Sequence, residues 1–532
     1  MSTNKQFDFN SRCFSAVVCF AGLILAFAPP DVCAAPARRP NLLFIMTDQQ
    51  RFDAMSCAGN TVIETPNMDR IAREGVMFSN CYSANPVCVP ARASILTGLS
   101  SVNVNVLSNG DYTSPDVPEV PTFDRVLKQN GYAAEYYGKW HTPHQFTDCY
   151  DNTMKVVGNV KGAPSQIQAY QAWLESKGVI PKTPGEGELY SGRNKRPYRP
   201  IELDLDYEKA KLGTDQKMKL KSKQVSQYGE IDLPPRVSYA AFTADETLLA
   251  LDRLKDQAFT LTCSFDPPHP PMVVQEPYYG MYPAKSIPKP QSIDDPMTDS
   301  PYRERANQND QLRYRNGEQI QGMRSIYYGM VREIDDWIGE ILNKLDALGL
   351  TENTLVVFIS DHGEMLGDHG MHSKMIFYEG SVHVPLLMRF PGRITPGTVV
   401  DAPVSQLDVC STILDYMGVP APENNGISLR FFVEGQTKEH DVVSFSTGTR
   451  TPNYMIRSGG LKLMMGKNKS NRGLNALYDL KADPQELRNL ILTPISPEGN
   501  RAQAEQMKKR LVEWMKKHEP QWADDLAQRK LY

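Results

Sequence analysis

Residues 85–98, NPVCVPARASILTG, place Cys88, Pro90 and Arg92 at alternate positions. If a helix begins at Cys88, Arg92 lies one turn later on the same face of that helix. Pro90 then falls in the first turn, where its missing N–H group costs nothing. Free N–H groups and the helix dipole make such a helix start attractive to anions. The spacing therefore indicates a cysteine and an arginine at an anion-binding helix start, although a buried cysteine on a helix with a surface arginine is an open alternative.

Polar residues follow two continuous apolar runs of the kind that form parallel strands buried on both faces. These runs are residues 41–46 (NLLFIM) and 354–360 (TLVVFIS). Asp48 and Gln49 follow the first run, and Asp361 and His362 follow the second. Ligands gather at the carboxyl ends of parallel strands, and hard oxygen ligands suit Ca²⁺ or Mg²⁺. His362 leaves Mn²⁺ as an alternative, and each aspartate alone could also be a turn or helix cap.

Three further residues could handle charge and protons. Lys139 and His141 are two positions apart, so they project on one face if a strand continues through them. Lysine can hold an anionic oxygen, and histidine exchanges protons near neutral pH. His269 lies among prolines, in a rigid loop that can aim it. Each of these residues alone could equally be a solvated or structural side chain.

Helical and strand patterns alternate along the chain and must position these residues. Predicted strands are residues 41–46, 132–137, 354–360 and 384–389, and predicted helices are residues 66–74, a short helix after Cys88, 123–129 with Thr122 as its cap, 323–348 and 408–417. This alternation predicts an α/β fold with a large, mostly parallel sheet flanked by helices.

The chain is expected to divide into three parts. Residues 38–430 form the catalytic domain, with loop insertions at about 150–235 and 270–322. Short alternating strands and a final amphipathic helix predict a smaller C-terminal α+β domain at 431–532. Six lysines between positions 209 and 223 could bind a polyanionic chain, or could lie in a solvated loop whose acidic neighbours cancel their charge.

The first 37 residues resemble a secretory signal peptide, with a basic start, a short apolar core and an Ala-x-Ala-like site. We therefore expect a secreted or periplasmic protein that is not integral to the membrane, because about fifteen apolar residues span a bilayer poorly. A net charge of −4 gives no reason to expect nucleic-acid binding. Six cysteines lie beyond this segment. Apart from Cys88, the sequence leaves open which of them form disulfides: Cys57, Cys81, Cys149, Cys263 and Cys410.

Taken together, the motifs resemble the sulfatase family of the alkaline phosphatase superfamily, in which the cysteine of C-x-P-x-R is oxidised to formylglycine by a separate maturing enzyme. The resemblance covers nearly the whole mature chain in the family's order. It rests on the Asp48 region, Cys88-x-Pro90-x-Arg92, GKWH at 138–141, PPHP at 267–270, SDHGE at 360–364 with the following Lys374, and LYDL at 477–480 with DP at 483–484 and NL at 489–490. The chain departs from the commoner family pattern at Gln49 and His362.

The resemblance implies a fold like that of alkaline phosphatase and hydrolysis of sulfate esters. Residue 88, Asp48, Gln49, Asp361 and His362 would hold the metal, most simply Ca²⁺. The hydrated formylglycine would attack sulfur. The remaining site residues would orient the diol (Arg92), balance charge on the transferring group (Lys139 and Lys374), protonate the leaving alcohol (His269) and regenerate the aldehyde (His141).

Two other functions fit the same residues. A phosphonate monoester or phosphodiester hydrolase of the superfamily can also contain the pairs Asp48-Gln49 and Asp361-His362. Lys139 and His141 favour a sulfate ester instead. A non-catalytic binding protein could keep the fold, but every expected functional position is filled. Export favours a sulfated polysaccharide or its fragments over an intracellular metabolite, with small sulfate esters also open.

Overall fold

Strand β1 (Asn41–Thr47) lies inside a large sheet in the computed structural model. Among the described residues this sheet has eight strands in the order β12-β2-β11-β9-β1-β7-β4-β5. The other strands are β2 (Val76–Phe78), β4 (Ala133–Gly138), β5 (Asn152–Lys155), β7 (Phe259–Ser264), β9 (Thr354–Ser360), β11 (Leu386–Arg389) and β12 (Thr398–Val400). β11 pairs antiparallel with β9 and β2, and the other neighbours pair in parallel. The predicted mostly parallel sheet is confirmed.

The structure describes residues 38–143, 149–155, 166–178, 228–230, 236–270, 272–303, 317–436, 439–447, 451–466, 475–492 and 497–531. Residues 39–532 form one compact unit. The signal-peptide prediction falls outside the described residues, as do the six lysines between 209 and 223. No helix in the described ranges combines the length and apolar character that crossing a membrane requires.

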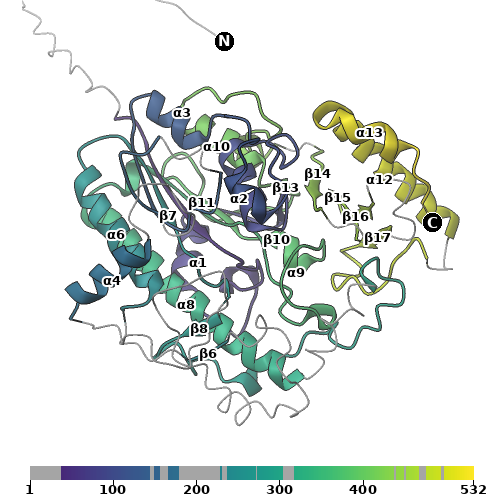
Figure 1. Ribbon diagram of the computed structural model, residues 1–532, viewed down its shortest axis with the longest axis horizontal. Coiled ribbons are helices and arrows are strands. Elements are labelled where there is room, and N and C mark those ends of the chain that lie inside the picture. The colour runs from purple at the N-terminus through teal and green to yellow at the C-terminus, as the bar shows by residue number, and fades with distance from the viewer. Residues whose placement is uncertain are drawn as a thin grey trace, which may run out of the picture. The chain divides into compact units, whose positions relative to one another are not determined.

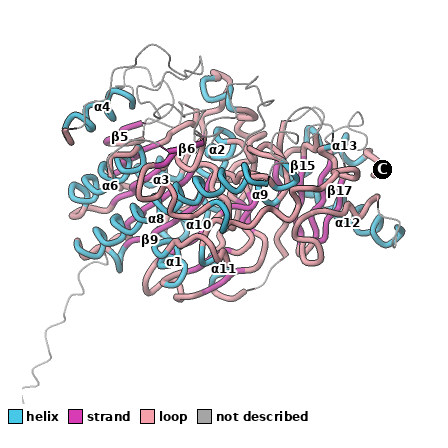
Figure 2. The backbone as a smooth tube through the Cα atoms, turned by 90° about the horizontal axis from the view of Figure 1, so that it is seen from below, coloured by secondary structure: helices cyan, strands magenta, loops and turns pink. Residues whose placement is uncertain are grey.

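Every residue of β1 and β9 is buried, because helices cover both faces of the sheet. One face packs on α1 (Pro66–Arg73), α4 (Gln166–Ser176), α6 (Tyr239–Leu254) and α8 (Gly317–Ala347). The opposite face packs on α2 (Cys88–Thr97), α3 (Phe123–Gln129), α10 (Asp408–Met417) and α11 (Arg430–Val433). Figures 1 and 2 show these helices around the central strands. Along β1, Leu43 and Ile45 face the first set, whereas Leu42 and Phe44 face the second.

Several predicted elements are confirmed at their bounds. α10 and β9 match the predicted ranges, and the Thr122 side chain caps α3 by accepting a hydrogen bond from the Arg125 N–H group. The predicted strand 384–389 is wrong as a single element, because Pro385 divides it. β10 (His383–Val384) joins a small sheet with β3 (Cys81–Tyr82) and β13 (Val404–Ser405), whereas β11 joins the large sheet. Proline cannot donate to a strand ladder, so the chain changes sheets there.

The stretches predicted as loop insertions contain regular elements in their described parts. The first holds β5, α4 and β6 (Tyr228–Glu230). The second holds β8 (Met272–Val274) and the short helix η4 (Ala284–Ser286), and α8 begins before its end. β5 extends the large sheet beside β4, so this part of the first insertion is structural rather than looped.

The C-terminal residues form an antiparallel sheet with helices, as predicted. Its strands are β14 (Val442–Phe445), β15 (Tyr454–Ser458), β16 (Leu461–Met465) and β17 (Ala476–Asp479). One face packs on α12 (Pro497–His518) and α13 (Pro520–Ala527). The opposite face packs on residues between Met365 and Val382, which come from the larger part of the chain. The boundary expected at residue 430 stays a prediction.

Candidate active site

Four neighbouring strands bring charged residues to one edge of the large sheet. β1, β9 and β4 end directly before Asp48, Asp361 and Lys139, and β7 ends two residues before Asp266. The register sets these ends level, because Thr47 pairs with Ser360 and Gly138 pairs with Ser264. All four charged side chains are buried. The carboxyl edge of the sheet therefore holds a cluster of buried charge, in which the strand-end positions of Asp48 and Asp361 were predicted.

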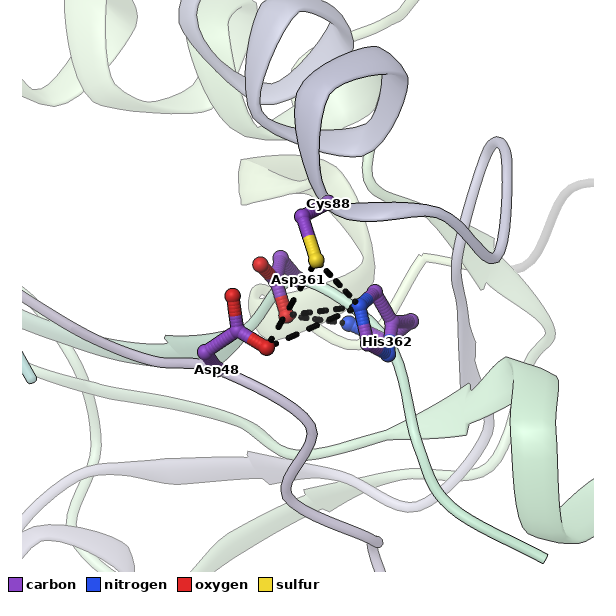
Figure 3. A group of neighbouring side chains, drawn as sticks. All are labelled: Asp48, Cys88, Asp361 and His362. Carbon is purple, nitrogen blue, oxygen red and sulfur yellow. Dashed lines mark hydrogen bonds and ion pairs between the residues drawn. The ribbon is translucent and has the colours of Figure 1, made fainter. Parts of the chain in front are cut away.

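Cys88, Asp48, Asp361 and His362 converge at this edge, with ligand atoms all within 4.8 Å of one another. Figure 3 shows Cys88 at the start of its helix with its sulfur directed toward His362 and the aspartates. Cys88 Sγ lies 3.1 Å from His362 Nε2 and 3.7 Å from Asp48 Oδ1. His362 Nε2 lies 3.6 Å from Asp361 Oδ1 and 3.7 Å from Asp48 Oδ1. These four residues are fully buried and come from three different segments of the chain.

Helix α2 begins at Cys88, one residue before the start expected from the sequence, and its opening turn is buried. The N-cap residue Val87 makes no capping hydrogen bond with its side chain, but Val89 N–H donates to Asn109 Oδ1 over 3.1 Å. Arg92 lies one turn later and is fully buried, so it is not the surface arginine of the alternative reading. The C-x-P-x-R spacing thus places a thiol and a guanidinium on one buried helix face.

Arg92 connects the two aspartates. Its Nε donates to Asp361 Oδ2 over 2.7 Å, and its Nη2 donates to Asp48 Oδ2 over 3.3 Å. Its Nη1 donates to the Lys139 carbonyl and to Ser264 Oγ, each over 2.9 Å. Burial opposes the charged form, but Asp361 and Asp48 raise the pKa of Arg92, which stays a cation. Arg92 therefore orients the carboxylates directly.

Lys139 is held between two carboxylates. Its Nζ lies 2.7 Å from Asp48 Oδ2 and 2.8 Å from Asp266 Oδ1. Asp266 was missed by sequence reasoning, because it stands in the proline-rich loop that drew attention only to His269. Its signal was its place: it follows the buried strand β7, as Asp48 follows β1.

Lys374, Gln49 and His269 surround the same group. Lys374 Nζ donates to Gln49 Oε1, and Gln49 Nε2 donates to Glu364 Oε2. The side-chain amide of Gln49 is therefore hydrogen-bonded to Lys374 and Glu364. The backbone N–H of Gln49 contacts the site directly, because it donates to Asp361 Oδ1 over 3.0 Å. His269 Nδ1 lies 2.7 Å from the Pro270 carbonyl oxygen, and burial together with the charges of Lys374 and Lys139 lowers the pKa of this imidazole.

The expected strand geometry of Lys139 and His141 is wrong. β4 ends at Gly138, whose φ of 97° turns the chain, and His141 has a φ of 43°. A Cβ at position 138 would lie 2.0 Å from the Ser264 carbonyl oxygen, so only glycine fits this close approach to β7. The half-buried His141 ring packs against Tyr112 of the short helix η2 (Asn109–Thr113), with 5.7 Å between ring centroids. Its catalytic role stays a prediction.

The charges around Cys88 favour its thiolate. Burial and Asp48 raise the pKa of this thiol, but Lys374, His362 and Lys139 outweigh them and hold it well below its usual range. Burial, followed by the charge of Asp48, raises the pKa of Asp361 to about 7. Burial acts against the charged form of Asp48 as well, but Lys139, His269, His362 and Arg92 hold its pKa well below its usual range, so Asp48 stays ionised and the repulsion between the two carboxylates falls on Asp361.

The family model described as "Sulfatase" matches residues 40–419, and thus most of the chain. The chain belongs to the sulfatase family. A second model, "N-sulphoglucosamine sulphohydrolase, C-terminal", matches residues 367–517 of this sulfatase. The converging residues described above lie within the first match.

Sequence similarity to known proteins covers most of this sulfatase. It is 29% identical over 474 residues to an arylsulfatase of Clostridium perfringens, covering 85% of this chain and 90% of the relative. It is 28% identical over 556 residues to an N-acetylglucosamine-6-O-sulfatase of Bacteroides thetaiotaomicron, covering 93% and 89%. The phosphonate monoester hydrolase of Agrobacterium radiobacter has the same fold, with a TM-score of 0.68, 24% identity, and coverage of 90% of this chain and 96% of that one. The chain is a sulfuric ester hydrolase with the alkaline-phosphatase-like fold.

Proposed function

We propose that this sulfatase hydrolyses sulfate esters of carbohydrates through a formylglycine derived from Cys88 and a bound divalent metal ion. The observation that carries the proposal is the contact of Cys88 with His362 and Asp48 at the buried start of α2. A thiol that only filled space would not need two carboxylates, an imidazole and three cations around it. The modification requires a sulfatase-maturing enzyme as partner.

The donor set fits a divalent cation. His362 Nδ1 lies 3.0 Å from the Gly363 carbonyl oxygen, which orients the ring and leaves Nε2 facing the two carboxylates. A carbonyl partner of this kind is what a metal-binding histidine requires. Asp48, Asp361 and His362 would hold the ion, with Gln49 supplying an amide oxygen if Lys374 releases it. Carboxylate and amide oxygens favour Ca²⁺ or Mg²⁺, and the imidazole admits Mn²⁺.

When bound, the cation supplies positive charge at the oxygen nucleophile that the hydrated aldehyde of residue 88 provides. The chain's own residues do the rest. Lys139 and Lys374 place positive charge beside Cys88, where an anionic sulfate must enter. Arg92 keeps Asp48 and Asp361 in fixed positions.

His269 is the group that protonates the leaving alcohol. Burial, then the charges of Lys374 and Lys139, lower the pKa of His269, so the imidazolium is a stronger acid than usual but is the minor form near neutral pH until an anionic sulfate enters. Lys374 and Lys139 act on the pKa of His269 and on that of Cys88, which indicates that this acid lies in the same cluster as residue 88.

Sulfated sugars are the proposed substrate class. The N-acetylglucosamine-6-O-sulfatase relative and the match to the "N-sulphoglucosamine sulphohydrolase, C-terminal" model support this class. The N-terminal segment resembles a signal peptide, and export would bring the enzyme to extracellular or periplasmic polysaccharide. Phosphonate monoester hydrolysis is the second candidate, because Asp48-Gln49 and Asp361-His362 resemble the pairs of that branch of the superfamily and a phosphonate monoester hydrolase shares the fold.

Two measurements test the proposal. The mass of the peptide that contains Cys88, from protein made together with a maturing enzyme, should show sulfur replaced by an aldehyde oxygen. Turnover should then be compared on defined sulfated sugars, an aryl sulfate, choline sulfate and a phosphonate monoester. An intact thiol in an active enzyme would overturn the formylglycine assignment, and a higher kcat/KM on the phosphonate would favour the second candidate.

A further inference from the structure

The C-terminal motif LYDL…DP…NL has no part in the chemistry above, yet it contains a buried acid. Glu486 lies between Pro484 and Asn489, is 3% exposed, and has a left-handed backbone with a φ of 55°. Non-glycine residues adopt this conformation at a cost, and they keep it only where their surroundings demand it. Glu486 is therefore held in place by specific contacts.

Those contacts form a buried charge network with Lys462 of β16 and Glu379 of the short helix α9 (Glu379–Val382). Lys462 is completely buried, and its Nζ lies 2.7 Å from Glu379 Oε1 and 2.6 Å from Glu486 Oε1. It also donates to the Phe377 carbonyl over 2.7 Å. Glu486 Oε2 accepts a hydrogen bond from the Glu379 backbone N–H over 2.7 Å. Lys462 of the C-terminal sheet thus holds the side chain of Glu379, and Glu486, in the segment that follows the sheet, holds its backbone.

Other groups complete the surroundings of Glu379. Its Oε2 accepts a hydrogen bond from the Tyr82 hydroxyl over 3.2 Å and lies 3.3 Å from His383 Nδ1. Arg457 of β15 donates to the same Tyr82 hydroxyl over 3.0 Å. A buried network in which every charge has a partner is rigid, whereas removal of one partner leaves another charge unpaired.

Helix α9 is hydrogen-bonded to two active-site loops, the one that contains His362 and the one that precedes Cys88. The Ser381 carbonyl accepts a hydrogen bond from Gly363 N–H over 2.9 Å, and the Val382 carbonyl accepts one from Ser83 N–H over 2.8 Å. Gly363 follows His362 directly. Ser83 lies five residues before Cys88, and its hydroxyl donates to the Asp361 carbonyl over 2.7 Å.

The backbone of Gly363 packs directly against the backbone of α9. A Cβ at Gly363 would lie 2.1 Å from the Gly380 carbonyl oxygen of α9. A shift of α9 must therefore move the backbone next to His362. Figures 1 and 2 both show α9 on the side of the molecule where strands β15 and β17 lie.

We infer that Lys462 and Glu486 are positioning residues of the active site, which act through Glu379 and α9 on the loops of His362 and Cys88. The inference deepens the proposed function, because those loops carry the proposed metal ligands. It makes the C-terminal sheet a part of the scaffold on which the metal affinity depends.

The test uses Lys462→Met, which keeps the length of the side chain and removes its charge. The matched control is Arg510→Met in α12. Arg510 pairs with Asp441 over 2.7 Å and with Glu439 over 2.9 Å, so it also ties parts of the C-terminal region together, but these partners lie outside α9. Both variants should lower the unfolding temperature.

Hydrogen exchange of the metal-free protein separates the two. Peptides that contain Ser83 and Gly363 should exchange about tenfold faster or more in Lys462→Met and at the wild-type rate in Arg510→Met. The dissociation constant for Ca²⁺ or Mn²⁺ should rise about 10- to 100-fold in Lys462→Met, as for loss of other groups that support metal ligands. Equal exchange in both variants would overturn the inference.

If Lys462→Met does not fold, Glu379→Gln takes its place. This variant keeps the backbone bond to Glu486 and weakens the link to Lys462, so it should show the same change in exchange on a smaller scale. Wild-type exchange in folded Glu379→Gln would likewise overturn the inference. Exchange requires neither metal nor substrate, so its outcome is independent of whether the proposed function is correct.

Discussion

Arg92 Nε donates to Asp361 Oδ2 over 2.7 Å, and neither side chain has any contact with solvent. Because the same guanidinium also reaches Asp48, one side chain sets the separation of the two carboxylates. An arginine can do this through its planar fork, whereas a lysine offers a single charged point. The first prediction follows from this difference.

Arg92→Lys should keep the charge but lose the bridge between the aspartates. The metal affinity should fall about 10- to 100-fold, and kcat should fall with it. Isothermal titration with Ca²⁺ or Mn²⁺ measures the first effect. The control is Arg389→Lys, a buried arginine of β11 that pairs with Glu74 over 2.8 Å and should keep its metal affinity. Wild-type affinity in Arg92→Lys would contradict the bridging role.

Cys88→Ala should abolish turnover and leave the fold nearly intact, because the side chain is small and removes only one buried atom. Cys410→Ala serves as control, since Cys410 is also a buried free thiol on a helix, α10. It should retain turnover. Near-wild-type activity of Cys88→Ala on any sulfate ester would refute the assignment of the nucleophile.

Asp361→Ala should lose metal and activity together, because it removes one of the two carboxylates of the donor set. Elemental analysis of the purified variant measures its metal content. Asp335→Asn is a suitable control: Asp335 is a buried aspartate that accepts hydrogen bonds from the first N–H groups of α1, away from the site. Full metal occupancy in Asp361→Ala would count against the metal site.

Asp266→Asn should lower kcat/KM about tenfold while the metal content stays at the wild-type level. Asp266 holds Lys139 but is outside the group of four converging ligands. Asp124→Asn, at a buried aspartate bonded to Thr260 over 2.6 Å, should leave the kinetics unchanged. Joint loss of metal and activity in Asp266→Asn would assign it to the metal site instead.

His518 should make stability depend on pH below neutrality. Burial, then the charge of Lys517, lowers its pKa from 6.5 to about 4. Between those values the unfolded chain binds a proton that the folded chain does not, so the free energy of unfolding falls as the pH falls. His518→Gln, which can still bond Asn425, should flatten the decline of unfolding temperature between pH 6.5 and 4. Parallel curves for variant and wild type would reject this.

Much of the fold could be predicted because its signals are local. Continuous apolar runs gave β1 and β9, and the hydroxyl of Thr122 gave the start of α3. Pro385 was a visible local signal against a single strand, because proline cannot donate to a ladder, but which sheet each half joins depends on its partner strands.

The relative positions of site residues could be predicted where they share one helix, but not where a turn separates them from the preceding strand. Cys88 and Arg92 share a helix, so their spacing fixed their geometry. His141 follows a glycine with positive φ, and no periodicity survives such a turn. Asp266 had a local signal in its place after an apolar run, but its contact with Lys139 depends on the pairing of β7 with β4, which no local pattern encodes.

The network around Lys462 also bears on the order in which the chain is made. Cys88 leaves the ribosome long before Lys462 and Glu486, which lie in the last strands and the motif that follows them. Until those residues arrive, α9 lacks the partners that fix Glu379, and the loop before Cys88 lacks a fixed neighbour. Cys88 is fully buried in the folded protein, but during synthesis it belongs to a region that has not yet completed its folding. Any enzyme that modifies Cys88 has that interval in which to reach it.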